Sequence, residues 1–135
     1  MRVVLDTNVI VSGLLTPHGP CGQIIELLLK GVLRACVDGR IVDEYDRILY
    51  RHRFHIPQAQ ASVILNEINA SAESIAAVPL PELLPDPDDA AFLEVAAAAD
   101  AVLVTGNARH FPSRARAGVA VVSPKEFLDL LRSAP

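Results

Sequence analysis

The first eight residues, MRVVLDTN, constrain the fold more than any other stretch of the chain. Residues 2–5 form a short apolar, β-branched run, which predicts a strand. A strand of this kind that stops at a carboxylate, here Asp6, is typical of the centre of a parallel α/β sheet. In such sheets the ligand crevice lies outside the carboxyl ends of the strands, so we expect Asp6 on its floor. The alternative is that Asp6 only caps the helix that follows.

Length and composition limit the class of protein. The chain has 135 residues, of which 51% are hydrophobic and 21% charged, and this indicates a globular protein that we expect to form a single domain over residues 1–135. Two cysteines, Cys21 and Cys36, are too few for a disulfide framework or a structural zinc site, which favours a cytoplasmic protein with reduced thiols. We expect neither a signal peptide nor a membrane span. The net charge of −4 argues against a large basic footprint for nucleic acid.

Strand and helix patterns alternate along the chain. Further strands are predicted at residues 33–37, 75–78, 101–105 and 119–122. Helices are predicted at residues 23–30, 40–51, 58–73, 90–99 and 124–131. Such alternation is typical of βαβ crossovers. We therefore expect an α/β fold, a three-layer α/β/α sandwich with a central, mainly parallel sheet of four to five strands.

Four polar side chains fall where this topology brings loops together. Asp6 ends the first strand, and Asn107 lies two residues past the strand that precedes it. Asp89 sits in the first turn of the helix leading into that strand, and Glu44 lies early in the helix after the second strand. In a parallel sheet these places share one edge, so we expect the four groups to converge.

Each of these residues also has a simpler explanation. Asp89, or its neighbour Asp88, is placed to cap a helix. Glu44 alone is typical of a solvated helix residue, and Asn107 alone is typical of a turn. Glu44 and Asp46 border opposite edges of the same apolar stripe, so periodicity does not choose between them. The functional interpretation therefore depends on the whole set.

Three carboxylates in one crevice indicate a cation site. They repel one another, and one of them takes up a proton unless a cation balances the charge. Carboxylates with an amide carbonyl and water suit Mg²⁺ or Mn²⁺. A competing hypothesis uses Asp6 as a phosphoryl-accepting nucleophile. Such enzymes usually place a second Asp two residues later, whereas this chain has Asn8 there.

Four short motifs, in order along almost the whole chain, resemble a PIN domain. They are LDTNV near the N-terminus, DEY at 43–45, LPDPDDAAFLEVA at 84–96 and VLVTGNARHF at 102–111. They are most similar to bacterial toxin components of toxin–antitoxin systems, relatives of the VapC-type toxins. The resemblance implies a three-layer α/β/α fold, a metal-dependent endoribonuclease that acts on RNA, and an antitoxin protein as a partner.

The resemblance also implies roles for single residues. The catalytic and metal-binding positions of the family fall on Asp6, Glu44, Asp89 and Asn107, with one or two Mg²⁺ or Mn²⁺ ions. The supporting polar positions fall on Thr7, Asn8 and Thr105, and Asp86 and Asp88 are alternatives to Asp89. The family often has Asp where this chain has Asn107. That departure keeps open a second function, a catalytically weak or inactive PIN-like module that binds RNA or protein.

Two basic clusters begin near the expected site. One comprises Arg47, Arg51, His52, Arg53 and His55, and the other comprises Arg109, His110, Arg114 and Arg116. They are placed to hold the phosphate backbone on either side of a cut, although surface arginines equally serve solubility. The expected RNA contacts are Arg47, Arg51, Arg53, Arg109 and His110. Apolar residues of the first two helices, with loop 16–20, are expected to form a homodimer or antitoxin surface.

Overall fold

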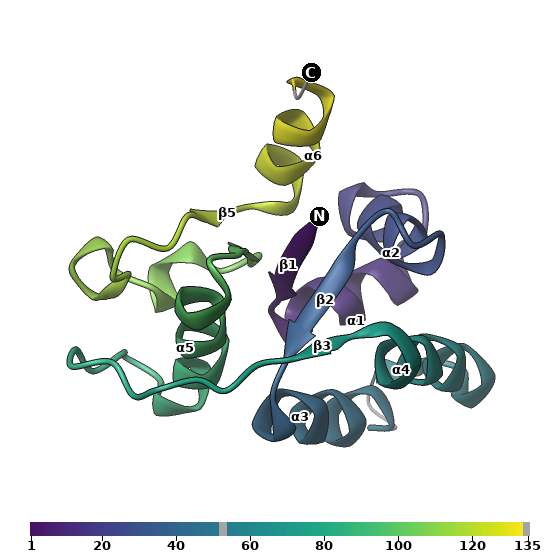
Figure 1. The fold of residues 1–135 in the computed structure, drawn as a ribbon. Helices are drawn as coiled ribbons and strands as arrows, with labels where there is room; N and C mark the ends of the chain where they lie inside the picture. The colour runs from purple at the N-terminus through teal and green to yellow at the C-terminus, as the bar shows by residue number, and fades with distance from the viewer. Residues whose placement is uncertain (52–53, 134–135) are drawn as a thin grey trace.

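The computed structural model describes residues 1–51 and 54–133. Their centre is a five-stranded sheet in the order β3-β2-β1-β4-β5, with every neighbouring pair parallel (Figure 1). The strands are β1 (Arg2–Leu5), β2 (Arg34–Val37), β3 (Glu73–Ser74), β4 (Val102–Val104) and β5 (Val121–Val122). The predicted α/β class with a parallel sheet is confirmed.

Helices cover both sides of this sheet. The α-helices of the described residues are α1 (Thr7–Leu15), α2 (Pro20–Leu29), α3 (Gly39–Leu49), α4 (Gln58–Ser71), α5 (Ala90–Ala99) and α6 (Pro124–Ser133). Helix α5 packs on β1, β2 and β4 from one side, and α1, α2 and α4 gather on the other (Figure 1). Short 3₁₀ turns are η2 (Pro87–Asp89), η3 (Ala108–His110) and η4 (Ser113–Ala115). None of the helices in the described ranges is long and apolar enough to cross a membrane.

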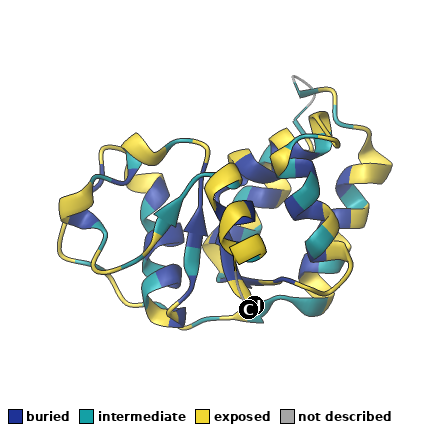
Figure 2. Cartoon of the chain, turned by 90° about the horizontal axis from the view of Figure 1, so that it is seen from above, coloured by how far each residue is buried: buried dark blue, intermediate teal, exposed yellow. Residues whose placement is uncertain are grey.

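The centre of the core is β1, as its sequence predicts. Val3 and Val4 are fully buried although they point to opposite faces, because helices cover both faces of the sheet (Figure 2). Tyr45 of α3 is also fully buried and donates a hydrogen bond of 2.5 Å to the carbonyl oxygen of Leu5. This bond ties α3 to the carboxyl end of β1 and thereby brings Glu44, the preceding residue, to the same edge.

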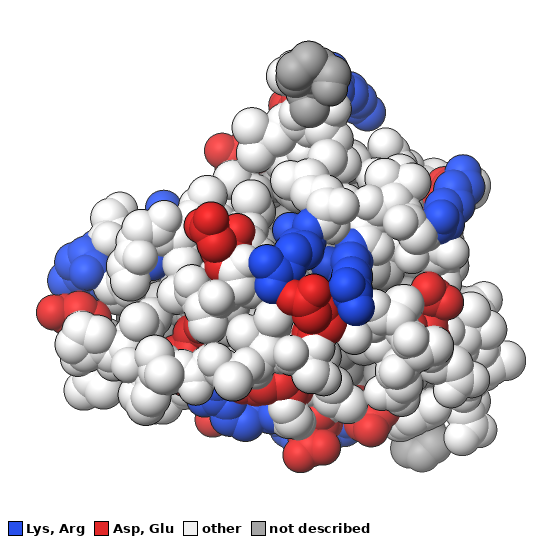
Figure 3. Space-filling model, in the orientation of Figure 1, with Lys and Arg blue, Asp and Glu red and all other residues white. Residues whose placement is uncertain are grey.

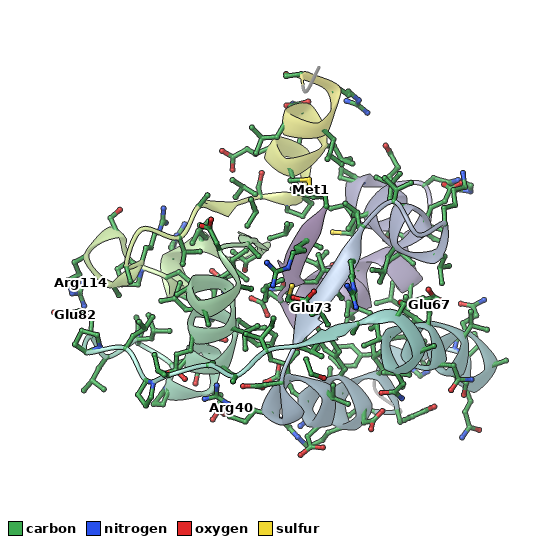
Figure 4. All side chains as sticks on the ribbon, viewed as in Figure 1. Met1, Arg40, Glu67, Glu73, Glu82 and Arg114 are labelled. Atoms are coloured by element: carbon green, nitrogen blue, oxygen red, sulfur yellow. The ribbon has the colours of Figure 1, made fainter. Side chains whose placement is uncertain are left out.

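The predicted strand at residues 75–78 is wrong. The third strand is Glu73–Ser74, and after the Ile75 amide donates to the Val37 carbonyl (2.8 Å) the described chain leaves the sheet. Glu73 explains the position of this edge strand, because its carboxylate pairs with Arg34 of the adjacent β2, at 3.2 Å, and with Arg2 of β1 beyond it. Figure 3 shows basic side chains next to an acidic side chain near the centre of the view. Figure 4, in the same orientation, labels Glu73 there.

Helix α1 has no counterpart among the helix ranges predicted from the sequence. It packs along α2 at close range, and Gly13 permits this approach. A Cβ atom at Gly13 would lie 2.6 Å from the Ile25 side chain and 2.8 Å from the Cys21 carbonyl oxygen. The helix after loop 16–20 begins at Pro20, earlier than predicted, because Pro is well suited to a first helical turn.

The strand order creates one topological switch point. From β1 the chain crosses to β2 on one side, and it later returns to β4 on the other side of β1. Ligands of open α/β sheets bind outside the carboxyl ends of the strands at such a point. Here those ends are Asp6, after β1, and Thr105, after β4.

Candidate metal and catalytic site

Asp6 lies at the switch point with its carboxylate turned inward. The residue is 6% exposed, and its backbone amide extends the β1–β4 pairing by donating to the Val104 carbonyl at 3.0 Å. Its Oδ2 accepts hydrogen bonds from the Thr105 hydroxyl at 2.8 Å and from the Asn8 side-chain amide at 3.3 Å. Its side chain forms no capping hydrogen bond to α1. Capping therefore does not explain the carboxylate, and the interpretation of Asp6 as a crevice residue is favoured.

Glu44 reaches the same place from α3. Its Oε2 accepts a hydrogen bond from the Thr7 hydroxyl, next to Asp6, and its side chain is 21% exposed. Asp46, the other candidate on this helix, is exposed. Of the two residues, Glu44 is therefore the one whose side chain lies beside Thr7 and Asp6.

Asp89 approaches from η2, at the start of α5. It is 9% exposed and does not cap α5. Capping of the turn is done by Asp86, whose carboxylate accepts from the Asp88 amide at 3.0 Å, while Asp88 itself is exposed. The Oδ2 atom of Asp89 is buried and receives no well-aligned hydrogen bond from the described residues. The Nδ1 of His110 lies 3.0 Å from it.

Asn107 contacts the other site residues through its backbone amide and its side-chain amide. Its backbone amide donates to the Thr105 hydroxyl oxygen at 3.0 Å, and its Nδ2 lies 2.9 Å from the Nε2 of His110. A chain of contacts therefore runs from Asp6 through Thr105, Asn107 and His110 to Asp89. The side chain of Asn8 adds a further link, because its Oδ1 accepts from the Gly106 amide at 3.2 Å. The predicted site and support residues thus form one cluster.

The carboxylates of this cluster bind protons more tightly than usual. Burial is the largest cause of the raised pKa values of Asp6, Glu44 and Asp89, and for Asp89 the pKa reaches about 6. The negative charge of Asp6 further raises the pKa values of the other two carboxyl groups. A divalent cation would relieve both effects, since it offsets the shared charge.

The donor atoms of the cluster are of the kind that a hard divalent cation prefers. The cluster offers three carboxylates and one amide oxygen, with the buried Oδ2 of Asp89 lacking a well-aligned donor among the described residues. Within residues 1–51 and 54–133, no three His, Cys, Asp or Glu side chains stand close enough together to hold an ion. Each carboxylate instead contacts a neighbouring group, Thr105 for Asp6, Thr7 for Glu44 and His110 for Asp89. Metal binding would thus require the carboxylates to draw together.

The basic residues take different positions around this cluster. Arg47 lines a cleft of 340 Å³ together with Glu44, Asp88 and Arg40. Arg40, which the sequence analysis did not select, is held between α3 and α5 by ion pairs to Asp38 (2.7 Å) and Glu94 (2.8 Å) (Figure 4). No motif in the sequence marks it, because its position depends on the contact between the two helices.

The other expected RNA contacts differ in position. Arg109 is exposed on η3, and Arg51 follows α3. Arg53 lies outside the described residues. His110, in contrast, faces the carboxylates.

Replacing Thr105 by Val is expected to lower activity about 10- to 100-fold while the fold is retained. Val has the same shape but lacks the hydroxyl that donates to Asp6 and accepts from the Asn107 amide. Thr105→Ser keeps the hydroxyl and is the matched control. Cleavage rates and far-UV circular dichroism of both variants provide the measurement. Equal rates for Thr105→Val and wild type would show that the hydroxyl does not orient the site.

Comparisons with known proteins agree with this arrangement. The family model described as PIN domain matches residues 2–109. Two solved structures share the fold at 19% sequence identity each. VapBC2 from Rickettsia felis, bound to a DNA fragment from its promoter, has a TM-score of 0.62, with 91% of this chain and 98% of that chain covered. PAE2754 from Pyrobaculum aerophilum has a TM-score of 0.61, with 98% and 90% covered.

A search of curated proteins found no match. The family model covers most of the chain, including the positions of Asp6, Glu44, Asp89 and Asn107. The chain belongs to the PIN domain family.

Proposed function

We propose that this chain is a metal-dependent endoribonuclease that hydrolyses RNA phosphodiesters, and that it is the toxin of a toxin–antitoxin pair. The observation that carries the proposal is the cluster at the switch point, where Asp6, Glu44, Asp89 and Asn107 converge from four separate segments. PIN domain proteins are generally nucleases, which supports the reaction class.

In this mechanism Asp6, Glu44, Asp89 and the Asn107 amide oxygen would hold Mg²⁺ or Mn²⁺. When bound, such an ion lowers the pKa of water and offsets charge on the scissile phosphate. The chain supplies the orientation. Thr105 fixes the Asp6 carboxylate, and the hydroxyl of Thr7 fixes that of Glu44.

Arginines supply the attraction for the substrate. Arg40 and Arg47 line the cleft beside Glu44, where a phosphate backbone would pass. Asp43 and Asp88 line the same cleft, and Arg40 is already paired with Asp38 and Glu94, so Arg47 carries most of this attraction. The face shown in Figure 3 carries basic and acidic side chains intermixed, so the approach of RNA depends on local rather than overall charge. The net charge of −4 agrees with this.

The test is cleavage of a panel of structured and single-stranded RNAs with Mn²⁺, with Mg²⁺ and with EDTA. We expect products with 5′-phosphate ends in the presence of either metal and none in EDTA. Glu44→Gln is expected to lower the rate by about 10²–10³-fold, the range typical of losing one electrostatic group of an active site. Asp46→Asn removes the same charge from the exposed side of α3 and is expected to leave the rate unchanged.

Two outcomes would overturn this proposal. Cleavage that persists in EDTA, or that is equal in wild type and Glu44→Gln, would mean that the cluster is not the hydrolytic site. RNA binding without cleavage in any metal would favour the binding module that the Asn at position 107 leaves open.

The antitoxin partner belongs to the same proposal. It is supported by the shared fold with a VapBC2 complex and by an apolar groove of 550 Å³ lined by residues of α1, α2, α4 and loop 16–20. Leu29 and Val63 expose apolar side chains there, at 43% and 57%, and a bound protein would cover them. A protein that is monomeric alone and forms a complex with its antitoxin would support this assignment, whereas self-association through the groove would favour the homodimer.

A further inference from the structure

The imidazole ring of His110 contacts two other residues of the cluster. Its Nδ1 lies 3.0 Å from the Oδ2 of Asp89, and its Nε2 lies 2.9 Å from the Nδ2 of Asn107. The two partners come from segments on either side of β4, η2 and the loop before η3. The imidazole therefore bridges the third and fourth positions of the candidate metal site. The sequence places His110 in a basic cluster and indicates no such bridge.

The chemistry of the ring assigns a direction to each contact. The Asn107 Nδ2 group can only donate, so Nε2 of His110 accepts and, in a neutral ring, Nδ1 carries the hydrogen. That hydrogen is then available to the Asp89 carboxylate, which has no well-aligned donor among the described residues. With Nδ2 engaged, the amide of Asn107 has Oδ1 left as its acceptor. Oδ1 is the atom that a hard cation requires.

We propose that His110 is a positioning residue of the metal site. It orients the Asn107 amide so that its oxygen, and not its nitrogen, is offered to the cation, and it restrains the carboxylate of Asp89. The inference deepens the proposed function and rests on it. Groups that orient metal ligands in this way affect metal affinity about 10- to 100-fold when they are removed.

The experiment is a calorimetric titration of the purified chain with Mn²⁺ alone, without RNA. His110→Ala is expected to raise the Kd for Mn²⁺ by about 10- to 100-fold, with the far-UV spectrum unchanged, because the side chain is 41% exposed and contributes little to the core. Ser113→Ala, at an exposed position of the next 3₁₀ turn η4, removes no charge and is the control. Its Kd for Mn²⁺ is expected to equal that of wild type.

Two conservative variants separate the two contacts. In His110→Gln the terminal amide occupies the place of Nε2 and can still accept from Asn107. In His110→Asn it occupies the place of Nδ1 and reaches only Asp89. If the orientation of Asn107 is the main effect, His110→Gln restores more Mn²⁺ affinity than His110→Asn. The Asn107→Ala exchange should then weaken Mn²⁺ binding less in the His110→Ala protein than in wild type.

Three results would contradict the inference. Unchanged Mn²⁺ affinity in His110→Ala, combined with a raised KM for RNA, would make His110 an RNA contact and leave the proposed function standing. No rescue by either conservative variant would reject the positioning role. If wild type does not bind Mn²⁺, or if Asp89→Asn binds it as tightly as wild type, the metal site itself is wrong and the proposed function fails with it.

Discussion

Asp6→Asn is expected to lower the rate of RNA cleavage by about 10³-fold, equivalent to ~4 kcal/mol of transition-state stabilisation. Asn keeps the size of Asp6 and one oxygen that accepts from Thr105, but it removes a full negative charge from the centre of the cluster. The site then holds a cation more weakly and no longer orients it. Single-turnover cleavage of a panel RNA in Mn²⁺ measures the change.

The same exchange is expected to stabilise the metal-free fold by about 0.5–2 kcal/mol. Burial raises the pKa of Asp6, which means that the folded chain bears the cost of a desolvated carboxylate at neutral pH. A neutral amide removes that cost. Thermal unfolding in EDTA measures it, with Asp129→Asn on the exposed side of α6 as the control. A variant that loses activity and stability together would indicate a damaged fold instead.

Acidification from pH 7 to pH 5 is expected to stabilise the metal-free protein through Asp89. The pKa of this carboxyl is about 6 in the folded chain against an ordinary value of 3.8, because burial and the charges of Asp6 and Asp86 disfavour the carboxylate. Between these two pH values the folded state binds a proton that the unfolded state lacks, so stability rises as the pH falls and is lost as the pH rises through 6. The gain is on the order of 1 kcal/mol over this interval.

The measurement is urea unfolding of wild type and Asp89→Asn in EDTA at both pH values. The difference in the free energy of unfolding between the two proteins isolates Asp89 from other titrating groups. We expect this difference to be smaller at pH 5 than at pH 7. Added Mn²⁺ should act in the opposite sense, because metal binding requires the deprotonated carboxylates and its stabilisation grows from pH 5 to pH 7. Parallel pH profiles of the two proteins would contradict the pKa assignment.

The elements with a strong local pattern were predictable from the sequence. The β1 run, the apolar stripe of α3 and the alternation that yields a parallel sheet are confirmed. The bounds of helix α1 were not predictable, although a helix after Asp6 is one alternative from the sequence. Val9, Ile10 and Val11 are β-branched and Ser12-Gly13 follows, all unfavourable in isolated helices. Burial of Val9 and Ile10 in the core overrides that preference.

Features that depend on distant partners were not predictable. Residues 75–78 have the better strand pattern, but pairing occurs at Glu73–Ser74, where two arginines from other strands hold Glu73. The sequence predicts that Asp6 and Asn107 lie at one edge, because they follow neighbouring parallel strands, and that Glu44 and Asp89 enter it from the first turns of crossover helices. Their role as metal ligands stays a prediction. The bridge made by His110 was not predictable, since it depends on the exact path of η3 after β4.

The pairing of β1 with β4 has a consequence for the timing of activity during synthesis. Asp6 is synthesised 99 positions before its partner Thr105. A growing chain that ends before β4 therefore has neither the hydroxyl that orients Asp6 nor the amide of Asn107. The proposed nuclease therefore cannot assemble its centre before translation has passed β4, and until then the RNA that encodes it is spared.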